Sequence, residues 1–199
     1  NIADDDMDWI AYTGPTPTLE TGPIADNSGQ GNYVYLEASG TACATGSEAT
    51  LRSDCFSFQS GGADSCHLSF YYHLWGVDVG ELRVEVSADG GLNWQTLWST
   101  TGSQGNSWQR SYLSLGFLPE GATFQIQFVG SKLDGPQGDI ALDDISLHGA
   151  SHLGPPTQVY FADQDGDGYG NAEQTLTTCL DTPPEGFVSN NQDCNDSRA

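Results

Sequence analysis

Apolar and polar residues alternate along several short segments of this chain, and this alternation limits its fold more than any other feature. In residues 81–87, Leu82, Val84 and Val86 alternate with charged neighbours. A period of two puts one side of an extended strand in a core and the other in solvent. Similar segments are expected at 32–38, 49–58, 66–75, 92–98, 108–115, 123–129 and 139–148. About ten short strands without helical periodicity predict an all-β jelly-roll sandwich.

The alternation breaks once, in residues 139–148. Ile140 and Leu142 share one parity, whereas Ile145 and Leu147 have the other. Both pairs can face the core only if the strand contains an extra residue, a β-bulge. The break falls at Asp143–Asp144. It indicates either two solvated acids at a strand end or a carboxylate turned inward toward a cation.

The chain is strongly acidic, with 27 Asp and Glu against 5 Lys and Arg and a formal net charge of −22. Nucleic acids and anionic membranes are disfavoured as partners, because both are bound through Lys and Arg. The acids suit divalent cations. No apolar run approaches the ~20 residues that span a bilayer, so no membrane insertion is expected. Without an initiator Met or a signal peptide, the sequence is expected to be a piece of a longer, processed protein.

The five cysteines indicate disulfides and an oxidising environment, since none lies at a spacing typical of zinc sites. We favour the pairs Cys43–Cys55 and Cys179–Cys194, with Cys66 unpaired or bonded to another part of a longer chain. The pair Cys55–Cys66 is the alternative, and spacing alone leaves both open.

A change of composition divides the chain. Residues 148–157, rich in Gly, Pro and Ser, predict a linker at 150–157 between a sandwich domain at 1–149 and a C-terminal segment at 158–199. The C-terminal segment contains too few apolar residues for an ordinary core. We therefore expect it to be small, irregular and stabilised by calcium.

Residues 163–171, DQDGDGYGN, begin like the calcium-binding loop of an EF-hand. Asp163, Asp165 and Asp167 occupy loop positions 1, 3 and 5, and Gly168 occupies position 6, where a sharp turn needs glycine. Tyr169 at position 7 would offer its backbone carbonyl oxygen. Position 12, where an EF-hand has a bidentate Glu, is Gln174, which is a poor substitute.

Other residues must therefore complete the calcium site, and we expect Asp193 and Asp196 to do so. Calcium takes six to eight oxygen ligands, and the loop provides about four. Asp193 and Asp196 flank Cys194. The expected Cys179–Cys194 disulfide would hold both carboxylates against the loop, and calcium binding would then contribute directly to folding.

Most of residues 4–148 resemble a MAM domain, an extracellular jelly-roll module. The resemblance rests on DMDWIAYTGPTPTLETGP (6–23), GNYVYLEAS (31–39), CHLSFYYHLWG (66–76) with GELRVEVS (80–87), and GDIALDDISL (138–147). It implies adhesion or oligomerisation and a structural cation, for which Asp26 and Asp144 are the matching candidates and Glu37 a third. For Asp26 the alternative is an Asx-turn before a strand.

The chain departs from the animal form of this module in its cysteines. The cysteine expected near the domain start is absent, as is the one after the final strand. Cys66 matches the remaining partner of that last bridge. The central segment 87–109 resembles the secreted bacterial branch of the family.

Residues 159–196 resemble the thrombospondin type 3-like calcium motifs of bacterial exoproteins. The resemblance rests on the order D-x-D-x-D-G-x-G, Cys179 and then Cys194-Asn-Asp. It implies a bound Ca²⁺. A disordered acidic tail is the alternative, but aromatic residues and two cysteines argue against it.

No catalytic site is predicted. Residues 87–94, SADGGLNW, match a sialidase Asp-box, but a propeller would repeat the box and here it occurs once. We expect a structural hairpin in which Asp89 bonds the turn and Trp94 packs beneath it. The histidines form no H-E-x-x-H motif, and His73 is expected to be a structural polar residue.

The sequence therefore predicts a non-catalytic, calcium-binding recognition or adhesion module, secreted or at a cell surface. Its parent is expected to be a secreted bacterial multidomain protein, an exoenzyme such as a peptidase. Its partners would be an extracellular protein or polysaccharide and the other domains of that chain. The alternative is a carbohydrate-binding module with a sugar subsite lined by Trp75, Trp94, Trp98 or Trp108, although packing explains most of these residues.

Overall fold

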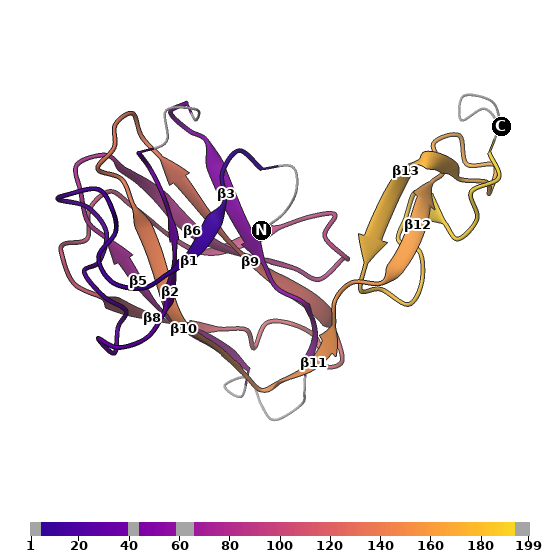
Figure 1. The fold of residues 1–199 in the computed structure, drawn as a ribbon. Coiled ribbons are helices and arrows are strands. Elements are labelled where there is room, and N and C mark those ends of the chain that lie inside the picture. The colour runs from indigo at the N-terminus through magenta and orange to yellow at the C-terminus, as the bar shows by residue number, and fades with distance from the viewer. Residues whose placement is uncertain (1–4, 40–43, 59–65, 194–199) are drawn as a thin grey trace.

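Two antiparallel sheets stack face to face in the computed structural model, which describes residues 5–39, 44–58 and 66–193 (Figure 1). The first sheet has the order β1 (Trp9–Tyr12), β2 (Tyr33–Leu36), β10 (Ile140–His148), β5 (His67–Leu74) and β8 (Gln109–Ser114). The second has the order β11 (Ala150–Gly154), β4 (Cys55–Phe58), β9 (Thr123–Lys132), β6 (Val79–Ser87) and β7 (Gln95–Thr101), with β3 (Glu48–Arg52) also paired to β9. The predicted jelly-roll sandwich is confirmed.

Alternating side chains from the two sheets form one core between them. Leu82 and Val84 of β6 are fully buried, and the intervening Arg83 faces outward. Phe70 of β5 reaches across to Phe128 of β9, with ring centroids 5.0 Å apart. No helix among the described residues is long and apolar enough to cross a membrane. The expected strands thus occur because their apolar side chains, at alternate positions, face this shared core.

The predicted bulge in the last long strand is present. The register of β10 against β5 shifts between Asp143 and Ser146, and Asp144 adopts a positive φ of 47°. The extra residue returns Ile145 and Leu147 to the side that faces the second sheet, where both line a cavity between the sheets. The parity change in the sequence is therefore a real structural feature.

Part of the expected linker at 150–157 is instead a strand of the sandwich. Gly149, with φ of 72°, turns the chain from β10 in the first sheet toward the second sheet. Residues Ala150–Gly154 then pair with β4 as β11. Its composition of Gly, Ser and His gave little sign of a strand, because an edge strand needs few buried apolar side chains.

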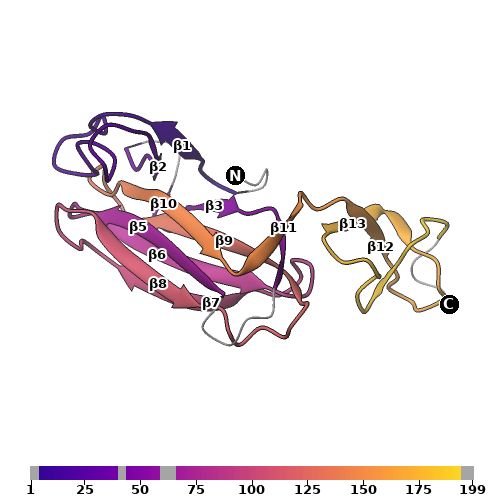
Figure 2. The same ribbon diagram turned by 90° about the horizontal axis from the view of Figure 1, so that it is seen from below.

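The composition of the C-terminal segment predicted an irregular structure, but the segment contains a small sheet. β12 (Gln158–Ala162) lies between β13 (Asn171–Thr178) and β14 (Phe187–Val188), and all its pairings are antiparallel. Tyr160 is its one buried apolar side chain among the described residues. Figure 2 shows this three-stranded unit continuing from β11 beyond one end of the sandwich.

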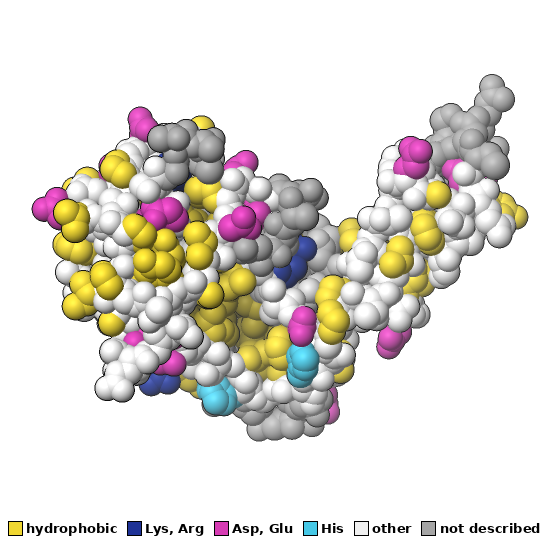
Figure 3. All heavy atoms as spheres, viewed as in Figure 1, with side chains coloured by type: hydrophobic (Ala, Val, Ile, Leu, Met, Phe, Trp, Pro, Cys, Tyr) yellow, Lys and Arg dark blue, Asp and Glu magenta, His cyan; other side chains and the backbone are white. Residues whose placement is uncertain are grey.

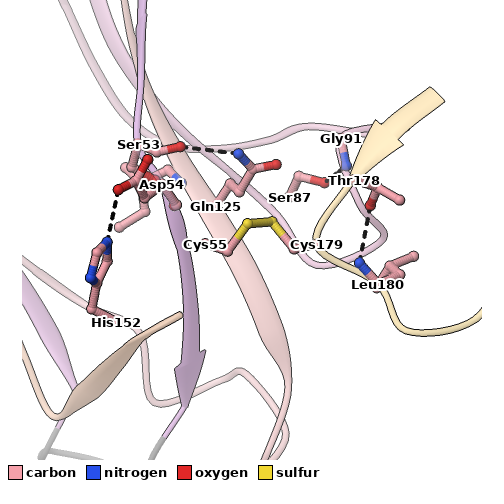
Figure 4. The surroundings of a disulfide bond; sticks show 11 residues. Ser53, Asp54, Cys55, Ser87, Gly91, Gln125, His152, Thr178, Cys179 and Leu180 are labelled. Carbon is pink, nitrogen blue, oxygen red and sulfur yellow. Dashed lines mark hydrogen bonds and ion pairs between the residues drawn. A yellow bond between two sulfur atoms is a disulfide. The ribbon is translucent and has the colours of Figure 1, made fainter. Parts of the chain in front are cut away.

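A disulfide joins Cys55 to Cys179, with Cα atoms 5.8 Å apart (Figure 4). Both favoured pairs, Cys43–Cys55 and Cys179–Cys194, are therefore wrong, and so is the alternative Cys55–Cys66. Cys43 and Cys194 lie outside the described residues, and Cys66 is buried and free.

Strand register explains the observed pairing. Gly154, the last residue of β11, pairs with Cys55, and Gln158 at the start of β12 pairs with Thr178. The hairpin therefore returns Cys179 to the point where the chain left β11. The sandwich also approaches this point directly, because a side chain added at Gly90 would clash with the Thr178 hydroxyl. The disulfide thus cross-links the small sheet to the sandwich.

Candidate metal centre

Three carboxylates converge in the connection between β12 and β13. The nearest oxygens of Asp163, Asp165 and Asp167 all lie within 4.8 Å of one another. Elsewhere among the described residues, no other three Asp, Glu, His or Cys side chains come together in this way. The loop predicted from its spacing therefore brings three possible cation ligands together.

Backbone amides hold the first carboxylate in place. Gly166 N donates to Asp163 Oδ1 (2.8 Å), and Gly168 N donates to Asp163 Oδ2 (3.1 Å). Both glycines have positive φ, 77° and 89°, which other residues adopt only with strain. Tyr169 N donates to Asp167 Oδ1 (2.8 Å). The sharp turn predicted at Gly168 is confirmed, and it wraps the loop around the three acids.

Asp165 shows that these residues fit a cation. Its Oδ1 accepts from Asp167 N (3.2 Å), whereas its Oδ2 is buried and accepts no hydrogen bond. A buried carboxylate oxygen without a donor is costly, and two further carboxylates beside it add repulsion. A hard divalent cation would remove both costs, because it prefers carboxylate oxygens.

The acidic loop and residues 190–193 do come together, although not through the expected disulfide. Asn190 Nδ2 donates to the carbonyl oxygen of Gly168 (2.9 Å), and Asp193 N donates to that of Gly170 (3.2 Å). Asp193 thus lies beside the loop, but its carboxylate is not part of the cluster of three. Asp196 lies outside the described residues. Gln174 is in β13, where its side-chain oxygen accepts from Gln164.

In the sandwich, Asp26 forms the predicted Asx-turn. Its Oδ2 accepts from Ser28 N (3.2 Å) and Ser28 Oγ (2.6 Å). Hydrogen bonds from the Gly31 amide and then from Ser28 lower the pKa of Asp26. Its Oδ1 is buried and accepts no hydrogen bond, so one oxygen remains for a cation.

The turn at Asp26 does contact the bulge of β10. Asn27 N donates to Asp143 Oδ2 (2.8 Å), and Asn27 Nδ2 donates to Asp144 Oδ2 (3.0 Å). Asp143 is half-buried and Asp144 is exposed, so Asp144 is not turned into the interior. The Asp26 turn and the bulge of β10, which the family resemblance named together, are therefore neighbours. They are joined by the N–H groups of Asn27.

Glu37 lies elsewhere. In the pairing of β2 with β10, Leu36 faces Ile140 and Val34 faces Leu142. Glu37 is therefore at the opposite end of this pairing from Asp143, about 13 Å away at ~3.3 Å per residue. The described structure does not bring Glu37 into one site with Asp26 and Asp144.

Glu37 has a different acidic neighbour, Asp139, which was not singled out from the sequence. Asp139 is fully buried, and its Oδ1 accepts from Ala38 N (3.0 Å). Burial raises the pKa of Asp139 to about 6; the Ala38 hydrogen bond opposes this shift and the charge of Glu37 adds to it. The sequence signal for this buried acid was the position of Asp139 between Gly138 and an apolar run that begins at Ile140.

The Asp-box is the structural hairpin that was expected. Asp89 Oδ1 accepts from Ser87 Oγ (2.8 Å) and Asn93 N (2.9 Å), and Trp94 Nε1 donates to Gly91 O (3.2 Å). His73 is buried beside Trp108 and bonds to Asn106 (3.1 Å). Its environment is that of a structural residue, as expected.

Most tryptophans pack within the sandwich. Trp98 contacts Phe70, with ring centroids 5.5 Å apart, and Trp108 contacts Tyr33 at 5.9 Å. Trp94 lies under the Arg52 guanidinium at 4.6 Å. Trp75 lines an open pocket with Glu20, Ser103 and Gln137, and Trp94 lines another with Asp89, Asn93 and Gln95.

Comparison with known proteins gives a consistent result. The family model described as MAM domain, meprin/A5/mu, matches residues 1–151. MAM domain-containing glycosylphosphatidylinositol anchor protein 1 of Gallus gallus is 36% identical over 151 residues, covering 72% of this chain and 15% of that protein. Neuropilin-1 of Xenopus laevis is 34% identical over 152 residues, covering 75% and 15%. The chain thus spans about 15% of the length of these relatives.

Similarity to solved structures is weaker. The K1 cleaved adhesin domain of Lys-gingipain from Porphyromonas gingivalis W83 superposes with a TM-score of 0.47 at 17% identity, covering 72% of this chain and 85% of that one.

Proposed function

The chain belongs to the MAM domain family over residues 1–151, and on this premise we propose that it is a non-catalytic recognition or adhesion module of a secreted multidomain protein. The family match carries this proposal. Its partner is an extracellular protein or polysaccharide, and the strong negative charge argues against nucleic acid. The resemblance of residues 87–109 and 159–196 to bacterial exoproteins supports a bacterial parent such as a secreted peptidase.

The absence of catalysis is directly testable on the 199-residue chain. Sialosides, peptides and common polysaccharides should show no turnover above a blank. Hydrolysis of any of them that a single substitution abolishes would refute the non-catalytic assignment.

We also propose that residues 158–199 bind Ca²⁺. The convergence of Asp163, Asp165 and Asp167 around a buried oxygen without a donor supports this site. The backbone carbonyl oxygen of Tyr169 and the carboxylates of Asp193 and Asp196 would complete the ligand set. The cation would offset most of the negative charge of the three clustered carboxylates and bind the loop to the returning segment.

Calorimetric titration with CaCl₂ tests this site. Wild type should bind with a dissociation constant of about 10⁻⁴ M or tighter. Asp165→Asn should weaken binding at least about tenfold, whereas Asp181→Asn, an exposed acid outside the loop, should leave it unchanged. Asp193→Ala and Asp196→Ala should also weaken binding, and wild-type affinity in either variant would remove that residue from the ligand set.

A second cation between Asp26 and Asp144 is a separate proposal. It rests on the buried Oδ1 of Asp26 and on the contact between the two segments through Asn27. Titration of the Asp165→Asn variant isolates this site. Residual calcium binding that Asp26→Asn removes would support it, and no residual binding would reject it.

A carbohydrate-binding function is the second candidate, and Trp75 favours it. This half-exposed indole lines a pocket with a carboxylate, a hydroxyl and an amide, a combination that suits stacking and hydrogen bonding to a sugar. A glycan array in the presence of calcium would test it. Selective binding that is lost in Trp75→Ala but retained in Trp94→Ala would favour this function over protein adhesion.

A further inference from the structure

An open pocket of about 500 Å³ lies at one end of the sandwich, where the connections β1–β2, β5–β6, β7–β8 and β9–β10 meet. Its lining consists of Glu20, Trp75, Gly76, Val77, Ser103 and Gln137. Its volume falls within the range of small-molecule sites, about 300–1,000 Å³. This is the pocket on which the carbohydrate-binding candidate rests, and its lining also indicates which kind of sugar it takes.

Hydrogen bonds between the connections hold this pocket in shape. Thr21 Oγ1 donates to the carbonyl oxygen of Trp75 (2.9 Å), and Gly76 N donates to Ser103 Oγ (3.4 Å). Gly76 has a φ of 136°, and a side chain added there would clash with the carbonyl group of Gln137. The site is therefore preformed, which lowers the entropic cost of binding.

The indole of Trp75 is not used in packing. Among the described residues, it makes neither a ring contact nor an N–H hydrogen bond, whereas each of the other four tryptophans makes at least one. Trp75 is half-buried, so the remainder of its side chain is open to the pocket. An indole offers an apolar face for the C–H groups of a sugar ring and an N–H group for one of its hydroxyls.

The Glu20 carboxylate lies at the wall of this pocket and has no positive partner. Its Oε2 accepts from Gln137 Nε2 (3.0 Å), and none of the ion pairs among the described residues includes Glu20. With a φ of 63°, it is one of two non-glycine residues with positive φ in the described part of the chain, the other being Asp144. Strained residues of this kind cluster at ligand sites.

The surroundings of the pocket are negatively charged. Among the described residues, no Lys, Arg or His belongs to its lining, and Asp78 Oδ2, beside it, accepts from Gln137 N (3.1 Å). The whole chain has 27 acids against 5 bases. On the face shown in Figure 3, Asp and Glu side chains are spread over the sandwich and the small sheet, whereas Lys and Arg side chains are few. Such a site favours a cationic ligand and repels an acidic one.

We propose that this pocket binds a sugar with an unsubstituted amino group, as a unit of a polysaccharide of 2-amino sugars. This assignment rests on the carbohydrate-binding function and specifies its ligand class. The sugar ring packs on the Trp75 indole, and its ammonium forms a charge-assisted hydrogen bond with the Glu20 carboxylate. The indole ring attracts the same cation. The Ser103 hydroxyl and the Gln137 side-chain oxygen remain for the ring hydroxyls.

A basic peptide fits this pocket less well. The ammonium of a lysine side chain would also meet Glu20, but its methylene stem offers no hydroxyl groups to Ser103 and Gln137. A sugar acid would bring a carboxylate toward Glu20 and Asp78 and would be repelled. A basic peptide is therefore the alternative that the experiment has to exclude.

Calorimetric titration of the whole 199-residue chain with three β-1,4-linked trisaccharides tests this assignment. Glucosamine trimer, cellotriose and N-acetylglucosamine trimer share one backbone and differ at carbon 2, which carries an ammonium, a hydroxyl or an acetamide group. At about pH 6, where alkyl amines are protonated, glucosamine trimer should bind with a dissociation constant below about 1 mM. The other two sugars should bind at least about tenfold more weakly, and so should trilysine, which is cationic but has no sugar ring.

Glu20→Gln separates the ammonium contact from stacking. It should weaken the binding of glucosamine trimer about tenfold, to the level of cellotriose, and leave the binding of cellotriose unchanged. Trp75→Ala keeps the charge and should weaken the binding of both sugars about tenfold or more. Glu120→Gln is the matched control, because it removes an exposed carboxylate at the opposite end of β9 from the pocket, and it should bind like wild type.

The outcomes separate this assignment from the function on which it rests. Equal affinity for the three sugars that is lost in Trp75→Ala would leave a carbohydrate-binding module and overturn the assignment of amino sugars. A retained preference for glucosamine trimer in Glu20→Gln would also overturn it, as would trilysine binding as tight as that of glucosamine trimer. If none of the three sugars binds, the assignment and the carbohydrate-binding function both fail.

Discussion

The sandwich and the C-terminal sheet are stabilised in different ways. The sandwich has a continuous apolar core from both sheets, with Phe70, Leu82 and Leu142 fully buried. The described part of the C-terminal segment contributes no residue to that core, and Tyr160 is its one buried apolar side chain. A unit of this size without a core requires a covalent or metal constraint. The disulfide is one such constraint, and the proposed Ca²⁺ in the acidic loop would be the second.

Removing a core side chain should affect the sandwich most. Phe70 packs against Trp98 and Phe128, so Phe70→Ala should lower the free energy of unfolding by about 3–5 kcal/mol. Denaturant unfolding followed by far-UV circular dichroism would measure this loss. Phe117→Ala, at a side chain that is 51% exposed, is the control and should change it by only about 0.5 kcal/mol. Equal losses in the two variants would contradict the assigned core.

Removing the cross-link should affect mainly the C-terminal sheet. The double variant Cys55→Ser and Cys179→Ser opens a loop with a sequence separation of 124, and disulfides contribute about 2–5 kcal/mol. We expect the sandwich to remain folded while limited proteolysis of residues 158–193 accelerates. Mass spectrometry of non-reduced wild-type peptides would identify the bridge. A Cys179–Cys194 peptide, or unchanged proteolysis in the double variant, would contradict this cross-link.

Much of the sandwich could be predicted from the sequence because most of its strands carry local information, although β1 and β11 were not expected. Alternation identified the long strands, and the parity change between Leu142 and Ile145 located the bulge of β10. The edge strand β11 was missed because few of its side chains are buried. Its sequence therefore lacks the apolar alternation of a strand that faces a core. Apolar periodicity thus predicts a strand only where the strand faces a core.

The candidate site was predictable only where its residues are close in sequence. The spacing of Asp163, Asp165 and Asp167 located the loop, because an i, i+2, i+4 turn brings these carboxylates together by itself. The pairing of Cys55 with Cys179 depends on the register of two sheets, which no spacing encodes. The separation of Glu37 from Asp144 likewise follows from the pairing of β2 with β10.

Two buried groups should act in opposite directions as the pH falls. Burial lowers the pKa of His73, and its bond to Asn106 opposes the shift only in part. As the pH falls below about 6.5, the unfolded chain binds a proton at His73 before the folded chain does, so the contribution of His73 to stability decreases until the folded pKa is passed. Asp139, whose pKa is raised to about 6, binds its proton first in the folded chain and therefore stabilises the sandwich over the same range.

Denaturant midpoints at pH 7.5 and pH 5 would measure this effect. From pH 7.5 to pH 5 the midpoint should fall less, or rise more, in His73→Gln than in wild type, whereas His148→Gln, at an exposed site, should behave like wild type. An identical change in all three proteins would exclude His73 as a titrating group.

Limited proteolysis with and without a calcium chelator tests most directly whether calcium organises the C-terminal sheet while the core alone holds the sandwich. The disulfide would retain cleaved fragments, so samples are reduced before separation. We predict that chelation exposes sites within residues 158–193 and leaves cleavage within residues 5–154 unchanged, with an unchanged unfolding midpoint for the sandwich. Identical digestion patterns with calcium and with chelator would contradict the account, as would cleavage spread equally over both regions.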